Sequence, residues 1–193
     1  AFREPVKGHV YISRHDSPST PVPGKKIETI LLQGNGIFNH GDQTYIYHGR
    51  WRNAITRNAA EEQITTTDDY CGEVALATLP RDRWGALGLY PDEKSGSVWS
   101  APLVLPEGGC RLSLNADGAS GMHVEIGDAN FNLIDRFSGT SAGSSTEEGG
   151  FDCPVAWPAG DIADLAGQPI RLRILIEKKG TADPRLYAVN LEI

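Results

Sequence analysis

The sequence lacks the long apolar run that a membrane-spanning helix requires. None of its segments approaches about 18 consecutive apolar residues. The first residues, Ala-Phe-Arg-Glu-Pro, also lack the apolar centre of a signal peptide. We therefore expect a soluble protein with no membrane partner. We also expect it to be extracytoplasmic, either secreted or periplasmic, with any export signal already removed.

Positive charge is also scarce. The chain has 18 Lys and Arg against 25 Asp and Glu, which gives a formal net charge of −7 and a pI near 5.2. Nucleic acids and anionic membranes bind to basic surfaces that neutralise their phosphates. The charge balance therefore argues against nucleic acid as a partner and favours an uncharged one.

Cysteine and methionine are few, and the composition does not favour long helices. Three Cys and one Met stand against 22 Gly and 12 Pro, a mixture that suits short strands and tight turns. Cys71, Cys110 and Cys153 show neither a Cys-x-x-Cys pair nor the His spacing of a zinc site. Their odd number permits at most one internal disulfide, which would join Cys110 to Cys153. Three buried free thiols are the alternative.

Cofactor motifs are absent apart from one candidate calcium site. Two turn-like stretches carry oxygen ligands at Asn115, Asp117, Asp128 and Asn130. Ordinary Asx turns use the same residue types, and we favour that interpretation. We expect no cofactor, with a structural calcium ion as the alternative.

The first part of the chain carries a clear hairpin signal. Gly41-Asp42 lies between two runs of strand-forming residues within positions 36–48. A further strand is predicted over residues 72–80. The polar stretch 54–70 that precedes this strand is predicted to be a long loop.

The second part of the chain has the pattern of an antiparallel β-sandwich, jelly-roll-like in its many short strands. Residues 138–150, rich in Gly, Ser and Thr, are predicted to form a flexible surface loop. The sequence thus predicts an all-β protein with an internal boundary near Trp84. The predicted strands of the second part are 97–105, 111–115, 123–126, 132–137, 151–156, 169–177 and 186–193.

Two runs in the first part carry a family resemblance. One is Gln33-Gly-Asn-Gly-Ile-Phe-Asn-His-Gly-Asp-Gln-Thr-Tyr-Ile-Tyr-His-Gly-Arg-Trp-Arg, and the other is Glu73-Val-Ala-Leu-Ala-Thr-Leu-Pro-Arg-Asp-Arg-Trp. They resemble the last blade of five-bladed β-propeller proteins of the glycoside-hydrolase type. Residues 165–173 and 185–189 are similar to the β-sandwich often appended to such propellers.

The resemblance implies an architecture and a partner. Residues 1–85 would form last-blade elements that are incomplete without upstream chain, and residues 86–193 would form the C-terminal β-sandwich. A lone blade leaves apolar surface uncovered, so we expect the upstream propeller polypeptide, from the same parent chain or a companion chain, as a partner.

The resemblance also implies a sugar pocket at the face where the inner strand begins. Amide and guanidinium groups bind hydroxyls and carboxylates, and a tryptophan ring offers a flat apolar face to a sugar. A half-exposed strand end explains the same residues without a ligand. The implied substrate-binding residues are Gln33, Asn35, Arg50, Trp51, Arg52 and Asn53.

Catalytic residues are not predicted in this chain. Glycoside hydrolysis needs two carboxylates on opposite sides of the scissile bond. The adjacent pairs Glu61-Glu62, Asp68-Asp69 and Glu147-Glu148 each have the character of solvated surface. The resemblance places the catalytic acids in earlier blades, so the parent protein would be the glycosidase.

Three functions are therefore open. The chain would complete and support the sugar pocket of a carbohydrate-active protein, or it would be a stand-alone carbohydrate-binding module of the lectin type, or it would be a purely structural cap. The second would use tryptophans as stacking platforms. The candidates for that role are Trp51, Trp84, Trp99 and Trp157.

Overall fold

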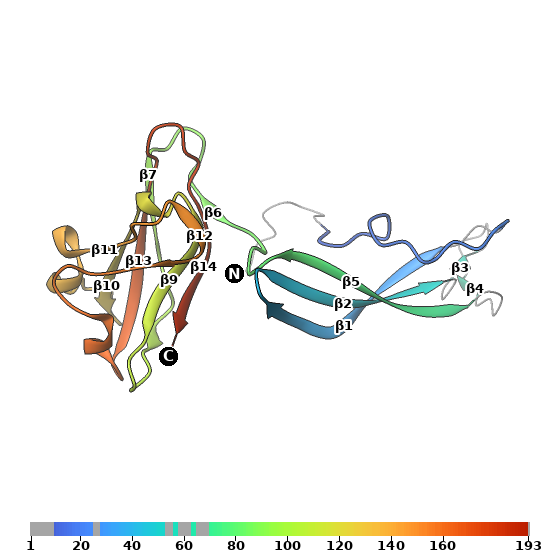
Figure 1. Ribbon diagram of the computed structural model, residues 1–193, viewed down its shortest axis with the longest axis horizontal. Coiled ribbons are helices and arrows are strands. Elements are labelled where there is room, and N and C mark those ends of the chain that lie inside the picture. Colours follow the sequence, from blue (N-terminus) through green and yellow to red (C-terminus); the bar gives the residue numbers. More distant parts are fainter. Residues whose placement is uncertain (1–9, 25–27, 53–55, 58–62, 65–69, 193) are drawn as a thin grey trace. The chain divides into compact units, whose positions relative to one another are not determined.

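The protein is all-β, as predicted, with several antiparallel sheets. The computed structural model describes residues 10–24, 28–52, 56–57, 63–64 and 70–192. The chain divides into two compact units, Ala1–Arg81 and Asp82–Ile193 (Figure 1). Within the described residues every helix is a short 3-10 turn.

The first unit contains a three-stranded antiparallel sheet in the order β1-β2-β5. The predicted hairpin is confirmed, because Gly41-Asp42 joins β1 to β2. Gly41 has φ +57°, and a glycine with positive φ in the first turn position matches the twist of the two strands. The sheet consists of β1 (Thr29–His40), β2 (Gln43–Arg52) and β5 (Cys71–Pro80).

An irregularity in β1 brings two backbones unusually close together. The β1–β2 register shifts between Gln33 and Gly36, which is a β-bulge. A Cβ atom on Gly34 would lie 2.3 Å from the carbonyl oxygen of Tyr47, so only glycine fits there. In the polar stretch after β2, the described residues form a short antiparallel pair, β3 (Thr56–Arg57) with β4 (Gln63–Ile64).

The second unit is a sandwich of two antiparallel sheets around one apolar core. One sheet has the order β11-β10-β13-β7, with β8 also paired to β13, and the other has the order β12-β9-β14-β6 (Figure 1). The strands are β6 (Leu87–Gly88), β7 (Ser95–Trp99), β8 (Leu103–Val104), β9 (Arg111–Asp117), β10 (Met122–Asp128), β11 (Gly143–Ser144), β12 (Gly149–Pro154), β13 (Pro169–Glu177) and β14 (Arg185–Glu192). The 3-10 turns are η1 (Ala119–Gly121), η2 (Asp135–Phe137), η3 (Gly139–Ser141) and η4 (Ile162–Leu165).

Period-two alternation explains which side chains form this core. In β13 the apolar residues at even positions are buried, whereas Arg171 and Arg173 between them are only partly buried. Successive side chains of a strand point to opposite faces of the sheet, so the even positions face the second sheet. There they meet Leu112, Leu114 and Ala116 of β9, which are almost completely buried.

Two local predictions for this unit are wrong, and one open alternative is decided. Residues 132–137 are not a strand, because Leu133 forms only an isolated bridge with Gly127 and the chain then enters η2. Residues 138–150 are not a plain surface loop, since they contain η3 and β11 and bury Gly143. Of the two alternatives left open for Cys110 and Cys153, the structure has buried free thiols and no disulfide.

Candidate functional site

The sheet of the first unit separates the predicted sugar-binding residues onto two faces. Gln33 pairs with His48, and Arg50 and Arg52 lie two and four residues further along β2 on the same face. Trp51 projects from the opposite face. The backbone of Asn35 lies in the β1 bulge, and Asn53 lies outside the described residues.

Both arginines hold an N-terminal segment against their face of the sheet, which we call the covered face. The Arg50 guanidinium donates to the carbonyl oxygen of Pro18 at 2.9 Å, and that of Arg52 donates to the carbonyl of Thr20 at 3.2 Å. Glu73 forms an ion pair with Arg50 at 3.0 Å and accepts the backbone N–H of Thr20. These contacts favour the structural interpretation of the two arginines.

Further side chains fix the same segment. The Ser17 hydroxyl lies 2.8 Å from Nε2 of the buried His48, and Thr29 Oγ1 accepts the backbone N–H of Ser19 at 2.8 Å. These contacts occupy one imidazole nitrogen of His48. Gln33, by contrast, is exposed on the same face.

Trp51 has the geometry of a stacking residue. Its ring lies against two glycines of the sheet: a Cβ on Gly49 would be 3.0 Å from the indole nitrogen, and one on Gly72 would be 3.5 Å from the ring. Tyr70 contacts the ring edge-on, with 5.3 Å between ring centroids. The indole is therefore held flat on the sheet and only partly buried.

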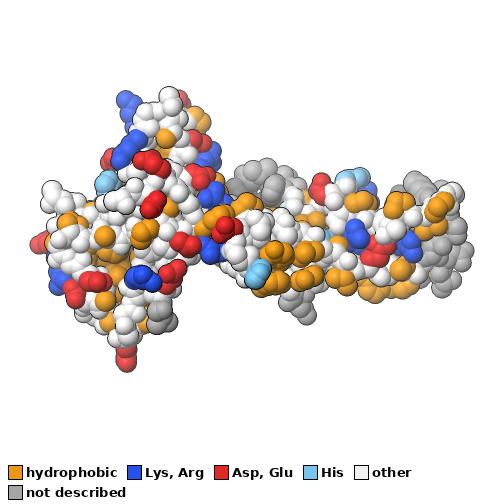
Figure 2. Space-filling view, in the orientation of Figure 1, with side chains coloured by type: hydrophobic (Ala, Val, Ile, Leu, Met, Phe, Trp, Pro, Cys, Tyr) orange, Lys and Arg blue, Asp and Glu red, His pale blue; other side chains and the backbone are white. Residues whose placement is uncertain are grey.

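The face that carries Trp51, which we call the open face, is rich in exposed apolar side chains. Phe38 stacks on Tyr45 with 5.2 Å between ring centroids, and Val74 is 78% exposed. Figure 2 shows apolar side chains at the surface along this sheet. The exposed large apolar residues of the open face are Leu32, Phe38, Tyr47, Val74 and Leu76.

The first unit has no apolar core among its described residues. The buried hydrophobic residues of the described chain all lie between Leu105 and Leu186, in the second unit. The buried side chains of the first unit are the polar Ser19, Thr44 and His48. The covered face also leaves an apolar side chain in solvent, since Ile37 is 55% exposed. Both faces of this sheet therefore present apolar surface to solvent.

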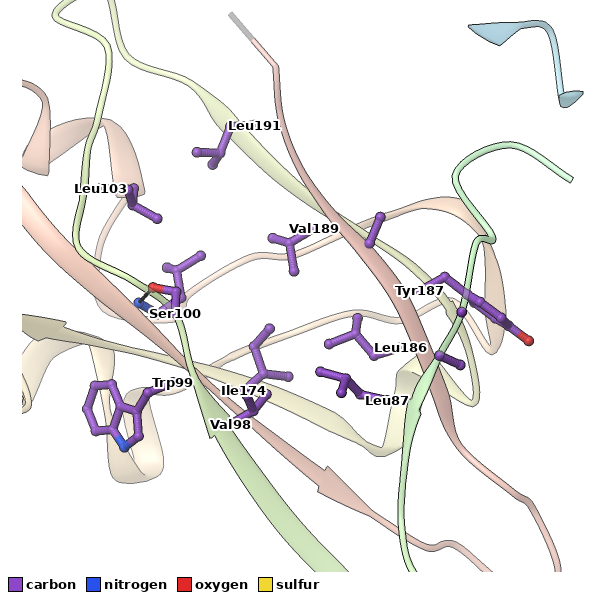
Figure 3. A pocket seen from close by; sticks show the side chains of 14 residues that line it. Leu87, Val98, Trp99, Ser100, Leu103, Ile174, Leu186, Tyr187, Val189 and Leu191 are labelled. Atoms are coloured by element: carbon purple, nitrogen blue, oxygen red, sulfur yellow. Dashed lines mark hydrogen bonds between the residues drawn. The ribbon is translucent and has the colours of Figure 1, made fainter. Parts of the chain in front are cut away.

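The second unit contains an apolar cleft of about 580 Å³ between its two sheets. Figure 3 shows Val98 and Ile174 of one sheet and Leu186 and Val189 of the other among the side chains that line it. Its titratable residue is Tyr187, whose hydroxyl donates to Asp117 and whose pKa is raised by burial and by that carboxylate. The cleft thus offers apolar packing surface without a pair of carboxylates.

The side chain of Arg83, in the second unit, binds two of the residues considered as calcium ligands. The Arg83 guanidinium donates to Asn115 Oδ1 at 3.1 Å and to Asp117 Oδ1 at 3.0 Å, and it lies 4.2 Å from the centre of the Tyr187 ring. Positive charge therefore occupies the place that a cation would need. No cluster of three or more His, Cys, Asp or Glu with metal-binding spacing occurs in the described part of the chain.

The other two calcium candidates belong to an Asx-type loop. The carboxylate of Asp128 accepts the backbone N–H groups of Asn130 and Asn132 at 2.8 and 2.9 Å, together with the Asn132 side-chain amide. These hydrogen bonds lower the pKa of Asp128. The loop uses this carboxylate for its own backbone, as the Asx-turn interpretation expects.

The acidic pairs and Trp157, which the sequence analysis considered for catalysis and sugar stacking, lie in different environments. Glu148 accepts a hydrogen bond from Ser120 at 3.0 Å on the surface, and the pairs Glu61-Glu62 and Asp68-Asp69 lie outside the described residues. Trp157 is buried and donates its indole N–H to the carbonyl of Val124 at 2.9 Å. It is a core residue and not an exposed platform.

Sequence reasoning missed a group of side chains around Trp99 on the outer face of the five-stranded sheet. Phe131 and Arg173 contact this tryptophan, and Arg171 lies over the Phe131 ring. The alternation of β13 identifies the two arginines as outward-facing. Nothing in the sequence places Phe131 beside them, because their proximity depends on a loop returning over the sheet.

No helix in the described part of the chain is long and apolar enough to cross a membrane. Comparison of the chain with protein families, with curated proteins and with solved structures finds no match.

Proposed function

We propose that the chain is the C-terminal segment of a carbohydrate-active protein of the glycoside-hydrolase type that acts outside the cytoplasm. Residues 1–85 complete a propeller and its sugar pocket, and the β-sandwich of residues 86–193 supports it. The observation that carries the proposal is that the three-stranded sheet has apolar side chains on both faces and no core among its described residues.

An antiparallel sheet with one face in water normally alternates apolar and polar residues. In β5 the run Val74-Ala-Leu-Ala places apolar side chains on both faces. Burying a side chain as large as Val or Leu contributes about 1.5–3 kcal/mol. A sheet with two apolar faces is stable when further sheets cover both of them, and a propeller blade lies between two neighbouring blades.

The sugar contact in this proposal is Trp51 on the open face, whereas Gln33 lies on the opposite, covered face and does not share this pocket. A flat, partly exposed indole packs against the C–H face of a sugar ring. Arg50 and Arg52 hold the segment around Pro18 against the covered face and so support the sheet from the side opposite this contact. The catalytic carboxylates belong to the upstream part of the protein.

A purely structural capping role is the second candidate. It is supported by Trp157, which serves the core of the sandwich, and by the arginine contacts that hold the N-terminal segment. In that case Trp51 would pack against protein and not against sugar.

Hydrogen exchange tests the architecture. In the 193-residue chain alone, the amides of β2 should exchange far faster than those of β13, because opening a sheet without a core costs little free energy. Adding the upstream polypeptide should slow exchange in β2 and leave β13 unchanged. A chain that is monomeric and equally protected in both strands when alone would refute the propeller proposal.

Substitution of the stacking residue tests the sugar contact. In the assembled protein, Trp51→Ala should raise KM for the glycan substrate by about tenfold, the loss expected for one buried aromatic contact. Tyr90→Ala is the control, since Tyr90 is 83% exposed and lies outside this sheet, and it should leave KM unchanged. Equal KM values for Trp51→Ala and the parent protein would favour the capping role.

A further inference from the structure

The outer face of the five-stranded sheet carries an arrangement of aromatic and charged side chains that the proposed function does not use. Trp99 of β7 pairs with Arg173 of β13, and Glu125 of β10 pairs with Arg173 from the other side. Directly paired residues project from the same face of a sheet. We call the group Trp99, Glu125, Phe131, Arg171 and Arg173 the aromatic face.

The Trp99 ring lies across the sheet. A Cβ on Gly127 of β10 would be 3.0 Å from the six-membered ring, so the indole reaches from β7 over β13 to β10. Phe131 meets it edge-on, with 5.3 Å between ring centroids. The Arg171 guanidinium lies 4.0 Å from the centre of the Phe131 ring. Both aromatic rings are thus held in fixed orientations.

Phe131 adopts a backbone conformation that is costly for its residue type. Its φ is +68°, in the left-handed region where Gly and Asn are favoured and bulky side chains are rare. The Asp128 carboxylate holds the loop in this shape through the hydrogen bonds described above. The ring is nevertheless 52% exposed. Such strain is characteristic of sites where a side chain is presented for binding.

A hollow of about 530 Å³ with a mixed polar and apolar lining lies along the same strand, β10. His123 lines it and lies two residues from Glu125, about 7 Å along the strand on the same face. Thr140 and Ser144 contribute hydroxyl groups to the lining. The backbone N–H of Gly139, at the edge of the hollow, donates to Glu125 at 2.8 Å.

The two arginines of the aromatic face have their guanidinium groups engaged within the protein. Arg173 forms an ion pair with Glu125 at 3.2 Å. Arg171 donates to the carbonyl oxygens of Ala129 and Ser100, both at 2.9 Å. Because these guanidinium groups already have protein partners, the face offers its aromatic rings to a ligand that does not need a carboxylate. The exposed Phe131 ring would pack against a flat apolar surface, with the perpendicular Trp99 ring beside it. The hollow offers hydroxyl and imidazole groups to a ligand rich in hydroxyls.

We propose that the aromatic face and the adjoining hollow bind a neutral saccharide. Phe131 packs against the C–H face of one sugar ring, the perpendicular Trp99 ring contacts the edge of that sugar, and His123, Thr140 and Ser144 hydrogen-bond the hydroxyls of the next. This site is separate from the pocket proposed around Trp51. Its carbohydrate class rests on the proposed function.

Affinity electrophoresis of the 193-residue chain tests the site. The gels contain one neutral polysaccharide each (β-glucan, xylan, arabinan, mannan or fructan), and a further gel contains the acidic polygalacturonate. At least one neutral gel should retard the chain. Phe131→Asn should weaken that retardation by about tenfold, since it removes a stacking ring. Asn suits the left-handed conformation, so its thermal midpoint should equal or exceed that of the parent chain.

Two further variants separate binding from folding. His123→Ala should also reduce the retardation, because it removes a hydrogen-bonding group of the hollow. Tyr90→Asn is the matched control, since Tyr90 is 83% exposed and lies outside the aromatic face, and it should migrate as the parent chain does.

Three results would overturn the proposal: no retardation in any neutral gel, retardation by polygalacturonate alone, or equal retardation of Phe131→Asn and the parent chain. These results are independent of the hydrogen-exchange experiment. A failure here combined with partner-dependent protection of β2 would remove this site and leave the proposed function standing.

Discussion

Gly143 of β11 is the position where one added methyl group should disturb the sandwich most clearly. A Cβ at this position would lie 2.5 Å from Cε2 of Trp157, 2.7 Å from its indole nitrogen and 2.7 Å from a methyl group of Val155. All three atoms belong to packed side chains that cannot move without displacing their neighbours. The Gly143→Ala substitution must therefore shift the Trp157 ring.

The expected cost has two parts. Forcing an extra methyl group into a packed core costs about 1–3 kcal/mol. Moving Trp157 also breaks the hydrogen bond from its indole N–H to Val124, which is 2.9 Å long and buried. A bond of this kind contributes about 0.5–1.5 kcal/mol. We therefore expect Gly143→Ala to lower the free energy of unfolding of the sandwich by about 2–4 kcal/mol.

Urea unfolding followed by hydrogen exchange in β10 and β13 measures this loss for the second unit alone. Gly108→Ala is the matched control, because no atom lies within 4 Å of the added Cβ and the backbone conformation is one that alanine adopts freely. The control should change the stability by less than about 0.5 kcal/mol. A Gly143→Ala variant as stable as the control would refute the packing described for Trp157.

Two further predictions concern titratable groups. In the native chain Ellman's reagent should react first with Cys71, which is only partly buried. Cys110 and Cys153 should react later, because burial raises the pKa of both thiols. After unfolding three thiols should react, and a total of one would indicate a disulfide. In a spectrophotometric titration Tyr187 should ionise above the usual tyrosine range, since burial and Asp117 raise its pKa. Because the pKa of Tyr187 is higher in the folded than in the unfolded chain, its contribution to stability is fully present below the unfolded pKa of about 10. This contribution is lost as the pH rises through the folded pKa. Tyr187→Phe should therefore reduce the loss of stability at alkaline pH.

Local patterns predicted those elements whose cause is local. The Gly41-Asp42 turn and the strand-forming runs beside it specify a hairpin, since the turn conformation and the alternation involve adjacent residues only. The alternation of residues 169–177 likewise predicted β13. The strand predicted over residues 132–137 failed because its pairing partner is tertiary: Leu133 meets only Gly127, and the chain then turns.

The candidate sites depended far more on tertiary contacts. Arg50 and Trp51 are adjacent in sequence and were predicted to act together, yet a strand places neighbours on opposite faces. Arg50 contacts Pro18, 32 positions earlier in the chain, which no local pattern indicates. Trp99 was a candidate by residue type alone, and its partner Phe131 comes from a loop after β10.

By itself the sequence determined the all-β class, the central hairpin and the acidic net charge, because composition, turn chemistry and period-two alternation are properties of neighbouring residues. Only the tertiary structure decided that the three thiols stay unpaired, that Trp157 is a core residue and that the sheet of the first unit has no core among its described residues. These features depend on which distant strands pair and in which register. A shift of one residue in that register would exchange the buried and the exposed faces.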